Sequence, residues 1–281
     1  MSETRVLLDG LAIGESPRWH EGRLWFSNWG AQEVVAVDLE GNSEVVVRVP
    51  AAFLFSIDWL PDGRLLAVSG MEALLLRREP DGSLATHAEL RGLAEGFNEI
   101  VVDARGNAYV NGGTYDFETG AGAESGIILL VDPDGAVRQV ADGINFGNGM
   151  AITPDGSTLI VAESWAGRLT AFDIAADGSL SNRRVWANTD GPPDGICLDA
   201  EGAAWYADVP NGRCVRVREG GEELQRVELD RGAFACMLGG PDGRTLFVLA
   251  AEWGGFENTD DAARTGQVLV TEAPAPAAGR P

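Results

Sequence analysis

The stretch PPDGICLDAEGAAWYAD, residues 192–208, shows the unit from which most of the chain is built. A carboxylate, Asp194, stands just before a short apolar run at Ile196–Leu198. A tight acidic turn with a glycine follows at Asp199–Gly202, and a second short run occupies Ala203–Ala207. Two short apolar runs joined by a glycine turn predict a pair of antiparallel β-strands.

The same unit recurs six times along the chain. Each copy has a glycine in the tight turn before a short apolar strand, and these glycines are Gly22, Gly63, Gly106, Gly156, Gly202 and Gly243. Subtracting neighbouring residue numbers gives intervals of 41, 43, 50, 46 and 41. A second turn, such as Asp81-Gly82, follows in each of the first five copies. Repeats of about 40–50 residues are typical of propeller blades, each a four-stranded antiparallel sheet.

The sixth copy is one strand short. After its turn glycine it has only the strands Thr245–Ala250 and Gln267–Thr271, whereas the N-terminus offers a spare strand at Arg5–Leu8. Pairing that strand with the sixth blade would close the ring and cover an open sheet edge. The sequence therefore predicts an all-β, six-bladed β-propeller in one domain, residues 1–272. The Pro- and Ala-rich residues 273–281 predict a disordered tail.

The charge and cysteine content restrict the location and the partners of the 281-residue chain. A formal net charge of −22 and a sequence pI of about 4.3 argue against nucleic acid and anionic membrane surfaces. The acidity suits cation binding, and it equally suits a well-solvated surface. The three cysteines, Cys197, Cys214 and Cys236, are odd in number and form no CxxC, so no disulfide framework is expected. These features predict a cytoplasmic protein with a small-molecule substrate.

Six positions that are equivalent by repeat lie eight residues before each turn glycine, or seven in the first copy. They are Glu15, Phe55, Asn98, Asn148, Asp194 and Ala235. Because the innermost strands of a propeller line its channel, these side chains should face the axis. Four carry oxygen donors, which suit Ca²⁺, Mg²⁺ or Mn²⁺. Any one Asn or Asp at a strand start commonly bonds nearby backbone, but unpaired carboxylates sharing one channel would be costly and favour a divalent cation.

Aromatic residues fall on the loops expected at the same mouth of the channel. They are Trp29, Tyr115, Phe117, Trp165, Trp253 and Phe256. They would either wall an apolar pocket above the metal or pack the loops against one another. If they form the pocket, Tyr115 and Trp165 are candidate substrate-binding residues. A serine hydrolase is not supported, because no GxSxG motif is present and the two histidines fall at a distant turn and in an outer strand.

Four segments also carry a family resemblance. They are GESPRWHEGRLWFSNW (residues 14–29), NFGNGMAITPDGSTLIVAES (145–164), PPDGICLDAEGAAWYADV (192–209) and FACMLGGPDGRTLFVLAA (234–251). Together they resemble the senescence-marker-protein/gluconolactonase family, which includes regucalcin, over about residues 5–271. The resemblance implies a six-bladed propeller that holds one divalent metal ion in its channel and hydrolyses lactones.

The resemblance also implies roles for individual residues. Glu15, Asn148 and Asp194 match the family's metal ligands, and Asn98 matches an Asn that contacts substrate or metal. Asp194 is in addition the expected catalytic group, as a general base or as a nucleophile. Ca²⁺ is the first candidate for the metal, with Mg²⁺, Mn²⁺ and Zn²⁺ as others.

The chain departs from the family pattern at Gly96. Sugar-lactonase members often carry an arginine there, two residues before the position of Asn98. Its absence weakens the expectation of a sugar lactone and opens the site to a less hydroxylated, more apolar lactone or ester. Two alternatives remain open: a phosphotriesterase-like hydrolase that uses the same metal and Asp194, and a non-catalytic, calcium-binding propeller.

Overall fold

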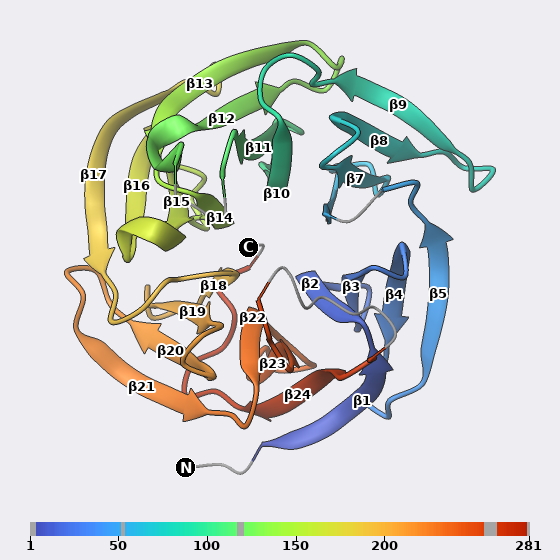
Figure 1. The fold of residues 1–281 in the computed structure, drawn as a ribbon, viewed down its shortest axis with the longest axis vertical. Helices are drawn as coiled ribbons and strands as arrows, with labels where there is room; N and C mark the ends of the chain where they lie inside the picture. The colour runs from blue at the N-terminus through green and yellow to red at the C-terminus, as the bar shows by residue number, and fades with distance from the viewer. Residues whose placement is uncertain (1–3, 52–53, 117–120, 256–262, 280–281) are drawn as a thin grey trace.

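The described strands form six four-stranded antiparallel sheets around a central axis (Figure 1). The computed structural model describes residues 4–51, 54–116, 121–255 and 263–279. Within each sheet the first strand lies nearest the centre and the fourth at the rim (Figure 1). Two short 3₁₀ turns, η1 (Ala123–Ser125) and η2 (Ser164–Ala166), accompany the strands. The predicted six-bladed β-propeller is therefore confirmed.

The first five blades are each built from consecutive strands, whereas the last takes its outermost strand from the N-terminus. Blade by blade, from the innermost strand to the outermost, they are β2 (Ile13–His20), β3 (Arg23–Trp29), β4 (Glu33–Val37) and β5 (Ser43–Arg48); β6 (Phe55–Trp59), β7 (Leu65–Ser69), β8 (Leu74–Arg78) and β9 (Leu84–Glu89); β10 (Gly96–Val102), β11 (Ala108–Gly113), β12 (Gly126–Val131) and β13 (Val137–Ile144); β14 (Gly147–Ile152), β15 (Thr158–Glu163), β16 (Arg168–Ile174) and β17 (Leu180–Asn188); β18 (Ile196–Leu198), β19 (Ala204–Asp208), β20 (Arg213–Val217) and β21 (Glu223–Glu228); β22 (Gly232–Gly239), β23 (Thr245–Ala251), β24 (Gly266–Glu272) and β1 (Arg5–Leu11).

The N-terminal strand closes the ring as predicted. Strand β1 pairs antiparallel with β24, from Arg5 opposite Val270 to Leu11 opposite Gly266. The strand runs three residues beyond the predicted Arg5–Leu8, with two register shifts on the way. The last blade thus combines both ends of the chain, and the open edge of β24 is covered.

The tight turns have the geometry that their glycines suggested. The Asp199 carboxylate accepts hydrogen bonds from the backbone N–H of Glu201 and of Ala203, at 2.9 and 3.0 Å. Gly202 then takes a φ of +77°, a left-handed conformation that favours glycine. In the first copy both Glu21 and Gly22 have positive φ, as in a two-residue type I′ turn. That shorter turn explains why the equivalent position lies seven residues back.

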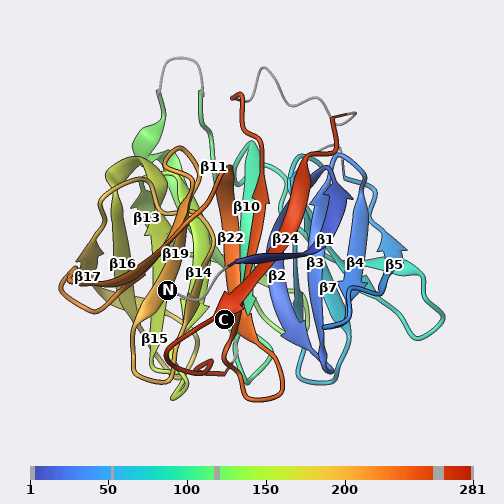
Figure 2. The same ribbon diagram turned by 90° about the horizontal axis from the view of Figure 1, so that it is seen from below.

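The hydrophobic core lies between the faces of adjacent blades. Between the second and third blades, for example, Val68 and Leu75 belong to the same buried cluster as Ile100 and Val110, and all four are fully buried. Figure 2 shows the ring from the side, with inner strands such as β10, β14 and β22 running along its axis. The six inner strands are thereby held at fixed positions around the channel.

The expectation of a disordered tail is wrong for residues 273–279. Ala275 is fully buried, and Ala277 forms a β-bridge with Asp199. The Ala277 N–H also donates to the Gly243 carbonyl at 2.9 Å. The low-complexity composition suggested disorder, but these small residues fit closely against the turns of the last two blades, where their backbone groups find partners. This segment crosses the turn face of the ring.

The three cysteines are free and buried. The part of the chain that the structure describes has no helix long and apolar enough to cross a membrane.

Candidate active site in the central channel

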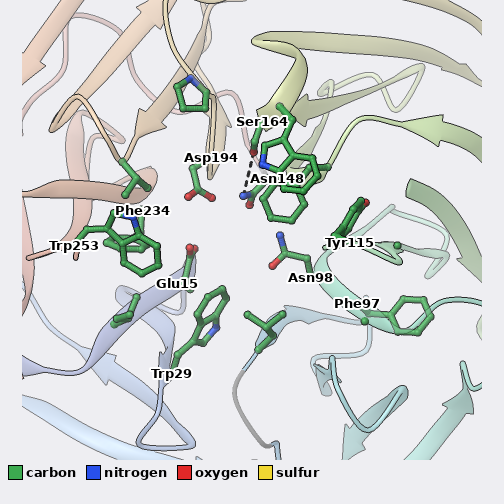
Figure 3. Close-up of a pocket in the computed structure, with 18 of the residues that line it drawn as sticks. Glu15, Trp29, Phe97, Asn98, Tyr115, Asn148, Ser164, Asp194, Phe234 and Trp253 are labelled. Carbon is green, nitrogen blue, oxygen red and sulfur yellow. Dashed lines mark hydrogen bonds between the residues drawn. The ribbon is translucent and has the colours of Figure 1, made fainter. Parts of the chain in front are cut away.

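The central channel opens on the loop face into a pocket of about 560 Å³ (Figure 3). The pocket brings together all six residues to which the sequence assigned a role: Glu15, Asn98, Tyr115, Asn148, Trp165 and Asp194. Of the other two ring positions, Phe55 and Ala235 are fully buried and do not line it. The aromatic residues Phe117 and Phe256, also expected at the mouth, lie outside the described residues.

β-Bulges aim three of the oxygen-bearing side chains at the axis. Strand β2 shifts register between Glu15 and Arg18, β10 around Asn98, and β14 around Asn148. A bulge places two residues opposite one and turns a side chain out of the regular alternation, and bulges are common beside active sites. In the second blade β6 pairs in unbroken register, and its ring residue Phe55 does not enter the pocket.

Close contacts between neighbouring inner strands fix Asp194. Its N–H donates to Ala207 O at 2.8 Å, and its carbonyl accepts from the Gly149 N–H at 3.2 Å. A Cβ at Gly149 would lie 2.5 Å from the Ile196 nitrogen, and a Cβ at Gly195 would lie 2.5 Å from the Cβ of its neighbour on β22. Glycine after Asn148 and after Asp194 therefore allows the inner strands to approach closely enough to form the site.

Two carboxylates meet at the floor of the pocket. Glu15 is 5% exposed, and Figure 3 shows it pointing toward Asp194. Burial and then the charge of Asp194 raise the pKa of Glu15 well above its ordinary value. Burial and the charge of Glu99 likewise raise the pKa of Asp194, against hydrogen bonds from Asn148 and Gly195. Asp194 is partly open to the pocket, but its buried Oδ1 has no hydrogen-bond partner among the described residues.

Two amide side chains complete the floor. The Asn98 Nδ2 donates to Gly147 O at 3.3 Å, and the Asn148 Nδ2 donates to Ser164 Oγ at 3.4 Å. The serine hydroxyl in turn donates to Pro193 O at 2.7 Å. The Asn148 side chain also donates a hydrogen bond to the Asp194 carboxylate. All four side chains face a common centre (Figure 3), and each amide supplies an Oδ1 that can only accept.

The floor fits a hard divalent cation. The buried Glu15 carboxylate, the partly open Asp194 carboxylate with its unpartnered Oδ1, and two amide oxygens are the donors that Ca²⁺ and Mg²⁺ prefer. The described residues contain no group of three or more His, Cys, Asp and Glu side chains arranged to hold a metal ion. Amide oxygens would therefore have to contribute to any metal site at this floor.

A second polar layer, which the sequence analysis missed, lies deeper in the channel. The buried Glu99 Oε1 accepts from Ser16 Oγ at 2.9 Å and from Arg18 Nη2 at 3.2 Å. Arg18 also lies 3.8 Å from Asp58. Counting back from the turn glycines picks out one residue on each inner strand. Glu99 and Ser16 are each adjacent to such a residue, so the count did not identify them. Polar residues inside otherwise apolar inner strands were the available signal.

Aromatic side chains form the walls of the pocket. Tyr115, Phe146 and Trp165 have ring centroids 4.9 to 5.7 Å apart on one side. Phe234 and Trp253 form an edge-to-face pair at 5.4 Å on another. The sequence left open whether these aromatic residues wall a pocket or pack the loops. They do both, because the rings pack together and also line the pocket. Phe146 and Phe234 were missed.

A comparison with models of known protein families identifies the family of this chain. The family model for the SMP-30/Gluconolactonase/LRE-like region matches residues 13–252. The chain belongs to this family. The predicted resemblance to the senescence-marker-protein/gluconolactonase family is therefore confirmed, and the matched segment includes every predicted site residue.

Several family relatives resemble the chain over nearly its whole length. The pentonolactonase XacC of Haloferax volcanii is 29% identical over 279 residues, which cover 94% of this chain and 92% of that protein. Regucalcin of Xenopus laevis is 30% identical over 260 residues, which cover 88% and 85%. Among solved structures, a calcium-binding protein, regucalcin, from Agrobacterium tumefaciens gives a TM-score of 0.80 at 24% identity over 99% of this chain and 96% of that one. This last likeness concerns the fold.

Proposed function

We propose that this protein is a metal-dependent lactonase, which hydrolyses the ring ester of a small lactone. The observation that carries the proposal is the pair of carboxylates, Glu15 and Asp194, that converge with two amides at the floor of an apolar pocket. Family membership and the pentonolactonase relative, which covers nearly the whole chain, support this reaction class. At 29% identity the relative does not identify the substrate.

Glu15, Asn148 and Asp194 would hold the metal, with Asn98 at the edge of its coordination or on the substrate. The oxygen-only donor set favours Ca²⁺, with Mg²⁺, Mn²⁺ and Zn²⁺ as further candidates. A bound divalent cation would polarise the lactone carbonyl and stabilise the negative charge that develops on its oxygen.

Asp194 is the group that we assign to proton transfer. As a general base it would take a proton from the water that attacks the carbonyl carbon, and the proton would pass to the ring oxygen as the C–O bond breaks. As a nucleophile, its carboxylate oxygen would attack the carbonyl carbon and form a mixed anhydride as the ring C–O bond breaks. The released alkoxide would take a proton from water, and a second step, hydrolysis of the anhydride by water, would return the Asp194 carboxylate. After a single turnover in H₂¹⁸O, label in the Asp194 carboxylate would identify the nucleophilic route, since the general-base route places ¹⁸O in the product alone.

The pocket walls would hold the substrate in place. Tyr115 and Trp165 would lie against the body of the lactone, and Asn98 would hydrogen-bond an oxygen of the substrate. The aromatic walls would also limit the water around the floor, which strengthens electrostatic interactions there.

The deciding experiment is lactone hydrolysis by metal-stripped protein with Ca²⁺, Mg²⁺, Mn²⁺ and Zn²⁺ added back one at a time. We expect activity to disappear on stripping and to return with at least one ion. Activity that is unchanged after complete stripping would exclude a metal-dependent mechanism. Tight metal binding without hydrolysis of any lactone would instead favour a calcium-binding propeller, and turnover of phosphotriesters alone would favour the phosphotriesterase alternative.

A further inference from the structure

We infer that the substrate is an uncharged lactone whose ring carries an apolar alkyl or aryl substituent, and not a polyhydroxylated or anionic lactone. The inference rests on the proposed function and deepens it, because it concerns what the pocket above the catalytic floor recognises. Its basis is the chemistry of the pocket walls, which is separate from the oxygen ligands below.

The walls above the floor are almost entirely apolar. Leu54, Met71, Phe146, Trp165 and Phe234 come from separate loops and strands, and all face the same space. A pocket of about 560 Å³ falls within the range of about 300–1,000 Å³ that is usual for ligand sites. It is large enough for a lactone ring with a sizeable substituent, and the substituent would contact mainly carbon.

Two of the polar groups in the walls are already used inside the protein. The Trp29 indole N–H donates to Phe55 O at 2.7 Å, and the Tyr115 hydroxyl donates to Gly112 O at 3.3 Å. A sugar lactone needs partners for several hydroxyl groups, and each hydroxyl buried without one costs affinity. These walls therefore discriminate against a polyol.

Gly96 removes one more source of polar contact. It lines the pocket without a side chain, and a Cβ there would meet nothing nearer than the Met71 sulfur at 3.9 Å. The space that a longer side chain would occupy is left to the substrate. The exposed methionine beside it, at 55% exposure, adds a flexible apolar surface at the rim.

The charge of the pocket excludes anions. The charged side chains among its described lining residues are Glu15, Glu95 and Asp194, and none of the lining residues is Lys or Arg. The proposed divalent cation would offset Glu15 and Asp194, so a carboxylate or phosphate on the ring substituent would find no basic side chain among the described lining residues. It would meet the charge of Glu95, within a chain whose formal net charge is −22. A neutral substituent is the class that this pocket accepts.

The test is a homologous series of γ-lactones with hydrogen, propyl, pentyl and heptyl substituents, beside a pentonolactone and a hexonolactone, with the ion that gives the highest rate. Burial of one CH₂ is worth up to about fourfold in kcat/KM. We expect kcat/KM to rise at least tenfold from the unsubstituted ring to the pentyl lactone. We also expect the two sugar lactones to react at least tenfold more slowly than the pentyl compound. A flat series, or faster sugar lactones, would overturn the inference and leave the lactonase proposal intact.

A binding arm separates the inference from the proposed activity. γ-Alkyl lactams have the same shape and resist hydrolysis, and their binding is measured by the change in tryptophan fluorescence. A Kd that falls with chain length supports the inference even if no lactone is hydrolysed, in which case only the proposed function fails. A Kd that is independent of chain length overturns it.

Trp165→Ala provides the matched variant. The side chain is 37% exposed on the 3₁₀ turn η2, so its removal spares the core. We expect the ratio of kcat/KM between the pentyl and unsubstituted lactones to fall at least threefold. Val185→Ala, which removes an exposed side chain from the outer strand β17, should leave that ratio unchanged. An unchanged ratio in Trp165→Ala would count against apolar recognition at this wall.

Discussion

Replacing Asp194 with Asn should stabilise the metal-free protein while abolishing hydrolysis. In the metal-free state the Asp194 carboxylate shares the channel floor with Glu15, and its buried Oδ1 has no hydrogen-bond partner among the described residues. An amide at this position keeps the shape of the side chain and removes the negative charge. Stabilisation by a substitution at the proposed catalytic position is the unusual outcome that this arrangement predicts.

The magnitude follows from the burial of the charge. Leaving a buried polar group unsatisfied costs about 1–3 kcal/mol, and the lower part of that range, about 1–2 kcal/mol, applies because Asp194 is partly open to the pocket. For a chain of this size that is a rise in Tm of about 2–6 °C. Because the pKa of Asp194 is raised in the folded protein, the cost is absent below the ordinary pKa of an aspartate, grows as pH rises from there toward the raised pKa, and is complete above it. The gain in Tm should therefore be larger at pH 8 than at pH 5.

The assay is thermal unfolding in EDTA at the two pH values, with Asp199→Asn as the control. Asp199 is also an aspartate and is buried, but its Oδ2 accepts from Arg216 Nε at 2.6 Å. Its loss should lower stability by about 1–3 kcal/mol because the arginine loses a buried partner. If Asp194→Asn lowers Tm in EDTA as Asp199→Asn does, then the carboxylate is satisfied within the protein and the reasoning is wrong. With metal at 100 times Kd the wild type should gain about 2.7 kcal/mol and overtake the variant.

Three further outcomes test the surrounding structure. Gly195→Ala should cost about 1–3 kcal/mol in urea unfolding and most of the activity, because its Cβ would lie 2.5 Å from the neighbouring strand. Glu163→Gln should cost about 1–3 kcal/mol at pH 7, because the fully buried carboxylate loses its bond to Arg168 at 2.9 Å. Despite burial, hydrogen bonds hold the pKa of Glu163 below its usual value, so the stability it contributes is lost as pH falls, and the difference from wild type should shrink toward pH 4. Truncation after residue 272 should lower Tm by several degrees, whereas truncation after residue 279, which keeps the contacts of Ala275, should not.

Counting along the repeats located the ring because repetition fixes the position of each inner strand. The same count could not distinguish Phe55, in regular register, from Asn98, which a bulge turns to the axis. At the sixth blade the count selected Ala235, but the bulge between Ala233 and Ala235 brings Phe234 into the pocket instead. A bulge depends on one extra residue in a hydrogen-bonded ladder, and apolar periodicity carries little trace of it.

Other features depended on contacts between distant parts of the chain. Glu99 meets Ser16, 83 residues away, and no local pattern announces that pairing. The tail residue Ala275 is buried although its composition is typical of disorder, because the turns of two blades supply partners for the segment. Such contacts follow from the closed ring, so they could be predicted only once the whole ring was built.

The floor and the walls of the pocket differ in how strongly the fold constrains their residues. Glu15 and Asn148 project from inner strands that each pair with the second strand of their own blade and pack against the inner strands of neighbouring blades, so a change there disturbs the ring. Trp165 and Phe146 lie on connections outside the sheet ladders, and Phe146 even adopts a φ of +53°. Substitutions on such connections cost little stability and alter the pocket directly. A propeller of this design can therefore keep one metal chemistry at its floor while its walls change from polar to apolar, and the walls, not the ligands, are where this chain's specificity should be sought.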